Sequence, residues 1–189
     1  MQGIESIRAK AFRLRGGIWT FLYVAILFLA YPTKSSVAYG ICFVALGQVV
    51  RFWAVGCIGR YRGECVSALA LTTWGPYAFV RNPLYVGNGF IGLGWSVMAD
   101  PLAVVIFVIT FILLYTVLIV PHEESFLLEK FGAEYSRYKE RTGSFFPRGW
   151  PGGRISGPFN SKILWVSEFH SLLTTVVGSL LIIAKGMIY

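Results

Sequence analysis

The chain has 189 residues, a formal net charge of +8 and a hydrophobic content of 56%, whereas charged residues make up only 14%. With a mean hydropathy of +0.63, this composition excludes an ordinary water-soluble domain and predicts a protein solvated by lipid. Because each crossing of the hydrocarbon core needs roughly 20 apolar residues, the length accommodates about five spans. We therefore expect an all-α polytopic membrane helical bundle forming a single domain, residues 1–189.

The first two predicted spans are residues 17–31 and 37–58. The first ends at Pro32, which cannot continue a helix, and the second contains a single charge, Arg51. The basic start of the chain resembles that of a signal peptide, but no small-residue cleavage site follows, so we expect a retained span. The basic residues before it are Arg8, Lys10, Arg13 and Arg15.

A polar stretch, residues 59–82, separates these spans from a predicted helical hairpin. The hairpin consists of residues 84–99 and 102–120, which are apolar and joined by Asp100 and Pro101. Glycine and proline in the polar stretch indicate a break in regular structure. We expect this stretch to be the first of two polar loops that carry function.

The remainder of the chain alternates between amphipathic and apolar character. Residues 122–138 have apolar side chains near helical spacing, which predicts a helix lying at the membrane surface. A connector rich in glycine and proline, residues 146–158, precedes the fifth predicted span, residues 163–189.

The distribution of lysine and arginine predicts the orientation, because positive loops stay cytoplasmic. Fourteen lie on one side of the predicted topology and two, Lys34 and Lys185, on the other. The N-terminus and both polar loops are therefore expected in the cytoplasm, with the C-terminus opposite. The net charge then reflects topology and attraction to anionic lipid headgroups, and indicates no nucleic-acid binding. Arg51, Glu168 and His170 lie toward cytoplasmic span ends, where snorkelling accounts for them, although each is also a candidate for a substrate cleft.

The segment that leads into the third span reads GPYAFVRNPLYVG. Pro83 suits the first turn of a helix and Asn82 is a candidate N-cap, so an anionic group could bind at this helix start beside Arg81. Alternatively, Arg81 marks the membrane interface, and Tyr77 and Tyr85 belong to an aromatic belt.

The segment after the fourth span reads PHEESFLLEKFGAEYSRY. Together the two segments resemble the membrane methyltransferase family that includes isoprenylcysteine carboxyl methyltransferases and phosphatidylethanolamine N-methyltransferases. The signature of that family is G-x-Y, then R-H-P-x-Y-x-G, a helical hairpin, and E-E before F-G-x-E-Y-x-x-Y. The resemblance covers residues 69–147 and rests on Gly75, Tyr77, Arg81, Pro83, Tyr85, Gly87, Glu123, Glu124, Phe131, Gly132, Glu134, Tyr135 and Tyr138.

The resemblance implies a cytoplasmic pocket for S-adenosylmethionine beside a lateral opening for a lipid-like acceptor. That cofactor carries a sulfonium, an ammonium and a carboxylate, so its pocket needs both acids and a base. By the resemblance, Glu123 binds the ribose or the ammonium group, while Glu124 points about 100° away on a helix. The residues implied at the cofactor are Tyr77, Arg81, Asn82, Pro83, Leu84, Tyr85, Gly87 and Glu123, and those implied in catalysis are Arg81, His122, Glu123 and Glu124.

Several of these residues have a second interpretation. The two glutamates could form an ordinary acidic first turn that complements the helix dipole. His122 is a candidate base for an amine acceptor, but an interfacial histidine is more often simply solvated. Four glycines of the third span either let the cofactor approach the backbone or serve helix packing, namely Gly87, Gly89, Gly92 and Gly94.

Two departures from the family pattern bear on the substrate. Asn82 stands where the family has histidine, and Ile119 stands where the carboxyl methyltransferases carry an arginine thought to hold the acceptor's carboxylate. The sequence therefore favours a phospholipid or another lipid-linked acceptor. The alternatives are carboxyl methylation of isoprenylcysteine, reduction of a sterol with NADPH, and a membrane scaffold without catalysis. The three cysteines lack metal-ligand spacing, so we expect free thiols, no disulfide and no metal site.

Overall fold

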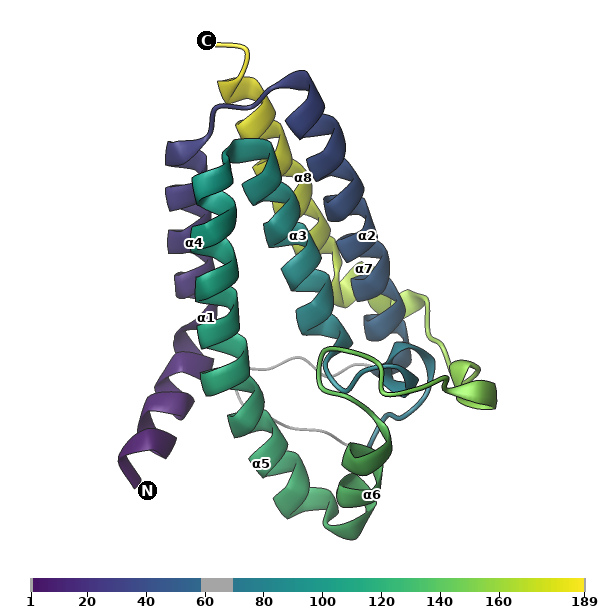
Figure 1. The fold of residues 1–189 in the computed structure, drawn as a ribbon. Coiled ribbons are helices and arrows are strands. Elements are labelled where there is room, and N and C mark those ends of the chain that lie inside the picture. Colours follow the sequence, from purple (N-terminus) through teal and green to yellow (C-terminus); the bar gives the residue numbers. More distant parts are fainter. Residues whose placement is uncertain (1, 59–69, 189) are drawn as a thin grey trace.

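The computed structural model describes residues 2–58 and 70–188, which form an all-α bundle (Figure 1). Residues 59–69 of the first polar loop, which include Arg60, Arg62 and Cys65, lie outside the described residues. The α-helices are α1 (Gln2–Leu29), α2 (Lys34–Ile58), α3 (Pro83–Ala99), α4 (Pro101–Phe111), α5 (Val120–Phe131), α6 (Ala133–Arg141), α7 (Lys162–Ser167) and α8 (Phe169–Lys185).

Several helices are apolar enough to cross a membrane. Within the described residues, three are also long enough, namely Gly3–Leu29, Lys34–Ile58 and the continuous helix Pro101–Phe131, and Phe169–Lys185 is a shorter apolar helix. Their outer faces carry exposed large side chains such as Phe21 and Leu113, as expected where lipid replaces water. The chain is therefore a membrane protein with several apolar helices, as its composition predicts.

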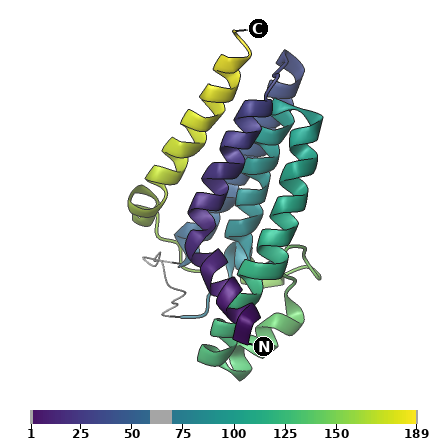
Figure 2. The same cartoon turned by 90° about the vertical axis from the view of Figure 1, so that its left-hand side faces the viewer.

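The first helix is longer than predicted. It begins at Gln2, fifteen residues before the predicted start at residue 17, because the basic N-terminal segment continues the same helix. Ala11 and Phe12 are buried in that extension and pack in a cluster with Tyr115. Figure 2 shows α1 running between α8 and α4, with its N-terminal turns beside α5.

The fourth span and the predicted surface helix are also one element. α4 passes through a π-helical stretch, Ile112–Ile119, directly into α5, so the predicted separation before residue 122 is wrong. The break comes instead at Gly132, whose φ of 51° lies in the left-handed region that favours glycine. The chain turns there into α6, and the fifth predicted span is likewise interrupted at Glu168 between α7 and α8.

Glycines bring α2 and α3 into close backbone contact. A Cβ on Gly47 would lie 2.6 Å from the carbonyl oxygen of Gly87, and a Cβ on Gly94 would lie 2.6 Å from that of Gly40. Gly89 and Gly92 face phenylalanine rings of α4 in the same way. The structure therefore supports the packing interpretation of the third-span glycines.

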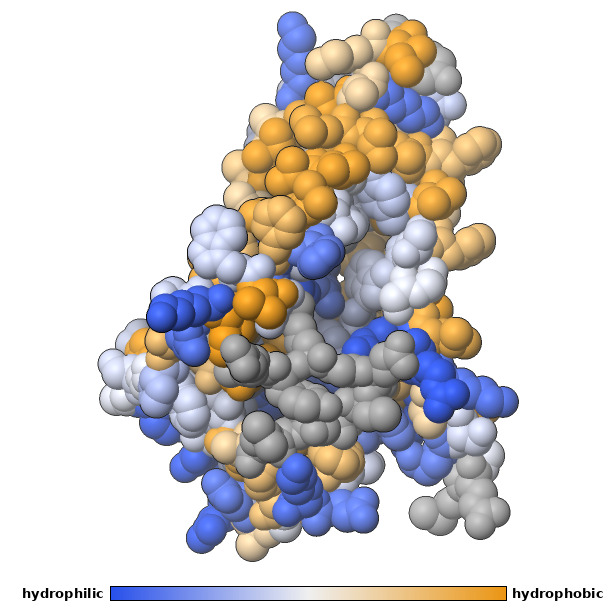
Figure 3. All heavy atoms as spheres, turned by 180° about the vertical axis from the view of Figure 1, so that it is seen from behind, coloured by the Kyte–Doolittle hydropathy of each residue, from blue (hydrophilic) through white to orange (hydrophobic). Residues whose placement is uncertain are grey.

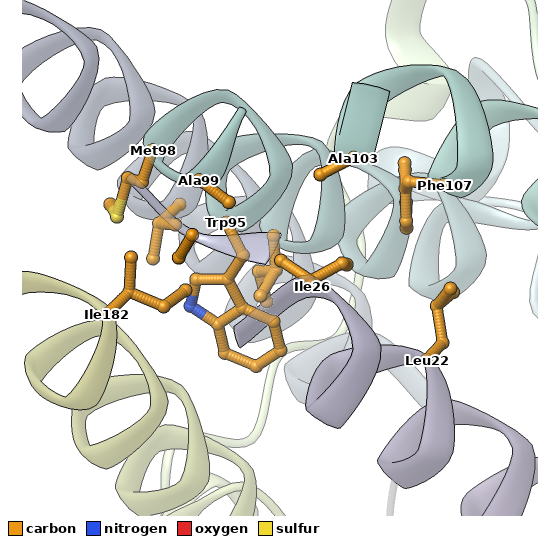
Figure 4. Packing of buried hydrophobic residues seen from close by; sticks show 11 residues of the cluster. Leu22, Ile26, Trp95, Met98, Ala99, Ala103, Phe107 and Ile182 are labelled. Atoms are coloured by element: carbon orange, nitrogen blue, oxygen red, sulfur yellow. The ribbon is translucent and has the colours of Figure 1, made fainter. Parts of the chain in front are cut away.

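The main apolar core lies away from the motif-bearing segments. Figure 4 shows Trp95 of α3 between Ile182 of α8 and Ile26 of α1, with Met98 of α3 on the side of Ile182 and Phe107 of α4 on the side of Ile26. This core fixes α3 within the bundle. The opposite end, which holds the N-terminus, α5, α6 and the start of α3 at the bottom of Figure 1, is called here the polar end.

A buried ion pair joins α2 to the break before α8. Arg51 donates to both carboxylate oxygens of Glu168, at 3.0 and 2.9 Å, and a third donor meets the side-chain oxygen of Asn88. Glu168 is fully buried, so the expectation that both side chains snorkel to the interface is wrong. Within an apolar bundle, this pairing offsets the cost of burying both charges. His170, by contrast, is exposed.

Breaking this pair should destabilise the bundle strongly. Arg51→Ala should cost about 3–5 kcal/mol, because it leaves a buried carboxylate without its bidentate partner. Arg8→Ala is the control: it removes an exposed pair with Glu5, so it should cost about 0–1 kcal/mol. Thermal unfolding in detergent measures both, and equal shifts for the two variants would contradict the assigned burial.

Candidate active site

The start of α3 is held by the segment that follows α6. The main-chain N–H groups of Arg81 and Asn82 donate to the carbonyl oxygens of Gly143, at 2.8 Å, and Ser144, at 3.2 Å. Asn82 precedes the helix as predicted, but its side chain makes no N-cap hydrogen bond. It donates instead to the Ser144 hydroxyl at 3.0 Å, so it joins two loops.

Arg81 and Glu124 form an ion pair between the two motif-bearing segments. The shortest Nη2–Oε1 distance is 2.6 Å, and the two side chains are only 7% and 11% exposed. Lys139 of α6 contacts the other carboxylate oxygen at 2.7 Å. Arg81 also donates to the carbonyl oxygen of Thr142. Both oxygens of Glu124 are therefore neutralised by cations, and the cluster ties α3, α5 and α6 together.

Glu123 turns to a different side of α5. Its carboxylate accepts a hydrogen bond of 2.6 Å from the hydroxyl of Tyr85 on α3. Among the described residues, no other side chain hydrogen-bonds to Glu123, and it forms no ion pair with one of them. Glu123 therefore keeps acceptor capacity that Glu124 has lost. Because α5 continues from α4, neither glutamate lies at a free helix start, and the helix-dipole interpretation does not apply.

A polar chain leads from this pair into the bundle. The ring of Tyr85 packs 4.4 Å from that of Tyr115, whose hydroxyl meets Asn88 at 3.4 Å and the indole N–H of Trp19. Asn88 in turn contacts Arg51. The sequence motifs did not indicate Asn88, Tyr115 or Trp19 as part of the site. The signal for Asn88 was a polar side chain within an apolar run, one turn beyond Tyr85.

The remaining predicted residues lie around these two clusters. The ring of His122 packs 5.7 Å from that of Phe12, on the side of α1. The main-chain oxygen of Tyr77 accepts a 2.8 Å hydrogen bond from Tyr138. Burial raises the pKa of the Tyr138 hydroxyl above its ordinary value, so it remains a donor at neutral pH. Gly87 faces α2, Pro83 is buried at the start of α3 and Leu84 is half-buried beside it.

Three of the cavities formed by the described residues lie beside α3 or α5. A polar pocket of about 370 Å³ is lined by Arg81, Glu124 and Lys139, and an apolar groove of about 630 Å³ lies between α2, α3 and α4. Both include Thr116. The third cavity, of about 410 Å³, lies on the other face of α3 against α1 and α8. All three are within the size range of small-molecule sites.

Metal-ligating side chains do not gather in the described part of the chain. Within residues 2–58 and 70–188, no group of three or more His, Cys, Asp or Glu side chains could hold a metal ion. Cys42 and Cys57 are free thiols, as expected.

Removing the Glu124 carboxylate should weaken the contact between the two motif-bearing segments. Glu124→Ala leaves the largely buried guanidinium of Arg81 without its carboxylate, so we expect a loss of about 3–5 kcal/mol in stability. Hydrogen exchange should also increase at residues 142–144, which this cluster holds. Glu129→Ala, an exposed acid of the same helix, is the control and should change neither readout. Unchanged exchange in Glu124→Ala would contradict the proposed tie.

Residues 35–134 match the family described as phospholipid methyltransferase. The matched region runs from the start of α2 to the start of α6. It therefore contains Arg81, Tyr85, Glu123 and Glu124, which make the contacts between the two motifs.

Curated relatives carry two kinds of name. The cobalt-zinc-cadmium resistance protein CzcN of Cupriavidus metallidurans is 33% identical over 149 residues, covering 72% of this chain and 65% of the relative. The nickel-cobalt-cadmium resistance protein NccN of Alcaligenes xylosoxydans xylosoxydans is 33% identical over 150 residues, covering 72% and 66%. The protein-S-isoprenylcysteine O-methyltransferase of Saccharomyces cerevisiae is 30% identical over 136 residues, covering 68% and 56%. The chain thus spans less than two thirds of the length of each of these relatives.

Proposed function

The chain belongs to the phospholipid methyltransferase family, and on that premise we propose that it transfers a methyl group from S-adenosylmethionine to a membrane-embedded lipid or lipid-linked acceptor. The observation that carries this proposal is the meeting of the two motifs. Tyr85 reaches Glu123 and Arg81 reaches Glu124, each at 2.6 Å, so the loop before α3 and the acidic turn of α5 form one site.

The two glutamates have different roles in this proposal. Glu124 and Arg81 are positioning residues, because their charges already satisfy one another and hold the loop after α6. Glu123 is the cofactor ligand, because its carboxylate keeps acceptor capacity for a ribose hydroxyl or an ammonium group. Tyr85 fixes the direction of that carboxylate. The carboxylate of Glu123, held by Tyr85, therefore fits a cationic nucleoside cofactor.

S-adenosylmethionine supplies an electrophilic methyl group on a sulfonium, and transfer requires a nucleophile in line with the breaking carbon–sulfur bond. The protein contributes position and the exclusion of water, which together can supply much of the acceleration. Held by Glu123, the cofactor would supply the methyl group and its sulfur would keep the electrons of the broken bond, while the acceptor would supply the electron pair of the new bond. A proton leaves the acceptor where it carries one. His122 is next to Glu123 in the sequence and is a candidate base for that proton. Its ring, however, packs against Phe12 of α1.

The membrane arrangement is part of the proposal. We place the whole chain in one domain with motif-bearing core 69–147, crossing the membrane about five times with the polar end in the cytoplasm. Lys185 supports the opposite location of the C-terminus, because it donates to the last carbonyl groups of α1 at the other end of the bundle. Its two acceptors are Leu27 and Phe28, at 3.0 and 2.6 Å.

A phospholipid-like acceptor is favoured over a carboxylate. Ile119 is fully buried in an apolar cluster with Phe12 and Leu114, at the position where the carboxyl methyltransferases carry an arginine. A carboxylate acceptor would find no cation there. The yeast relative is named for isoprenylcysteine O-methylation, so carboxyl methylation of a prenylated cysteine remains the second candidate. The names of the two bacterial relatives specify metal resistance and no acceptor.

Calorimetry with S-adenosylmethionine tests the cofactor site. The protein in detergent should bind it. Glu123→Ala should weaken binding by about tenfold or more, because a hydrogen bond to a charged group is lost. Tyr85→Phe should weaken binding by about fivefold, because a neutral hydrogen-bond donor is lost. Glu129→Ala provides the matched acidic control and should bind normally. Absence of binding to the unmodified protein, or NADPH binding in its place, would overturn the proposal and favour the reductase or scaffold alternatives.

A methyl-transfer assay separates the two acceptor classes. Phosphatidylethanolamine and a farnesylcysteine analogue are supplied in parallel with labelled S-adenosylmethionine, and label should enter the phospholipid. Ile119→Arg should not improve that reaction, because the added cation would be placed within a buried apolar cluster. Label found exclusively in the farnesylcysteine analogue would instead establish the carboxyl methyltransferase activity.

A further inference from the structure

A hollow opens between α1 and α8 on the face of the molecule opposite to Figure 1. Figure 3 shows it where the apolar upper part of this face meets the polar lower part. The cavity has a volume of about 410 Å³, and α3 forms its floor. Its lining includes Trp19, Tyr23, Asn88, Trp95, Thr174 and Thr175. Neither motif of the predicted site lines it.

The cavity has a polar end and an apolar end. Asn88 of α3 and His170 and Ser171 of α8 line the end near the Arg51–Glu168 pair. Two turns farther along α3, Trp95 lies edge-on to Tyr23 of α1 with ring centroids 4.8 Å apart. An occupant of this cavity therefore needs a polar head and an apolar body.

The hydrogen-bonding pattern of the walls restricts that head. The hydroxyl of Thr174 donates to the main-chain oxygen of His170, and that of Thr175 to the main-chain oxygen of Ser171, both at 2.8 Å. Each threonine proton is thus used within α8, and the hydroxyl oxygens remain as acceptors. At these two threonines, a matching head must therefore bring its own O–H or N–H donor.

The charges near the cavity further restrict which lipid head group can bind. The guanidinium of Arg51 is neutralised by Glu168, and His170 of the lining is exposed, so neither offers a buried net positive charge to an anionic head. The lining otherwise holds no acid that would balance an ammonium group within the described residues. A charged head at this depth would be costly, whereas a hydroxyl is not.

We propose that this cavity is a second lipid site, which binds an uncharged long-chain alcohol with its hydroxyl donated to Thr174 or Thr175 and its chain against Trp95 and Tyr23. The site is separate from the proposed cofactor position at Glu123. It does not depend on the proposed methyl transfer, because binding of the alcohol requires neither the cofactor nor turnover.

Photolabelling tests the site directly. Hexadecanol carrying a diazirine near the end of its chain is added to the protein in phosphatidylcholine nanodiscs, and labelled peptides are identified by mass spectrometry. Labels should fall on α1, α3 and α8, and unlabelled hexadecanol should compete. Labels confined to α2 and α4, which line the apolar groove, would overturn the proposal.

Competitors that differ in one group test the recognition of the hydroxyl. 1-Methoxyhexadecane lacks the donor and should compete at least about fivefold more weakly than hexadecanol, because the threonine oxygens are left without a partner. Palmitate should also compete more weakly, since its carboxylate brings acceptors only. Equal competition by the ether, or preference for palmitate, would refute an alcohol site.

A matched pair of variants assigns the effect to this cavity. Thr175→Val removes one acceptor at nearly constant shape and should reduce the preference for the alcohol over the ether by about threefold or more. Thr116→Val makes the same change in the apolar groove and should leave the preference intact. Thermal unfolding of both variants checks that the fold is retained. A loss of preference in Thr116→Val alone would move the site to the groove.

Discussion

The requirement that buried charges be paired organises the polar end of this bundle. Arg81 and Glu124 come from segments more than forty residues apart, and neither could remain charged among apolar helices without the other. Their pairing fixes the start of α3 against α5, and Lys139, a second cation on Glu124, adds α6 to the same cluster and shares the neutralisation of that carboxylate. The second pair, Arg51 with Glu168, does the same between α2 and the start of α8. Charge pairing thus sets the positions of elements that apolar packing alone would leave free to slide.

That arrangement also explains why adjacent glutamates differ in role. A helix separates consecutive side chains by about 100°, so one acid can satisfy the scaffold while the other faces Tyr85. If a single carboxylate served both purposes, binding of a cationic ligand would compete with the ion pair that holds the site together. Two neighbouring acids avoid that conflict, and the continuous helix from α4 fixes both directions.

The sequence predicted the helical class, the apolar runs and the meeting of the two motifs, because apolar periodicity and paired charges are local or family-level signals. It could not predict where α1 begins, since basic residues interrupt the apolar run without interrupting the helix. The join between α4 and α5 was missed for a similar reason: a change from apolar to amphipathic character was interpreted as a new element. The partner of each glutamate depends on the rotation of α5 against α3, which no spacing in the sequence reveals.

The face of α3 that carries Tyr85 also carries Asn88 and Trp95, at helical spacing. The contacts from Glu123 through Tyr85, Tyr115 and Asn88 therefore reach the floor of the cavity between α1 and α8. Trp19 belongs to both regions, since it lines the cavity and its indole donates to Tyr115. An occupant pressing on Trp19 would act on the same tyrosine that packs against Tyr85. The polar end and the lipid-facing cavity are thus joined by packed side chains and hydrogen bonds that involve α1, α3 and the π-helical stretch.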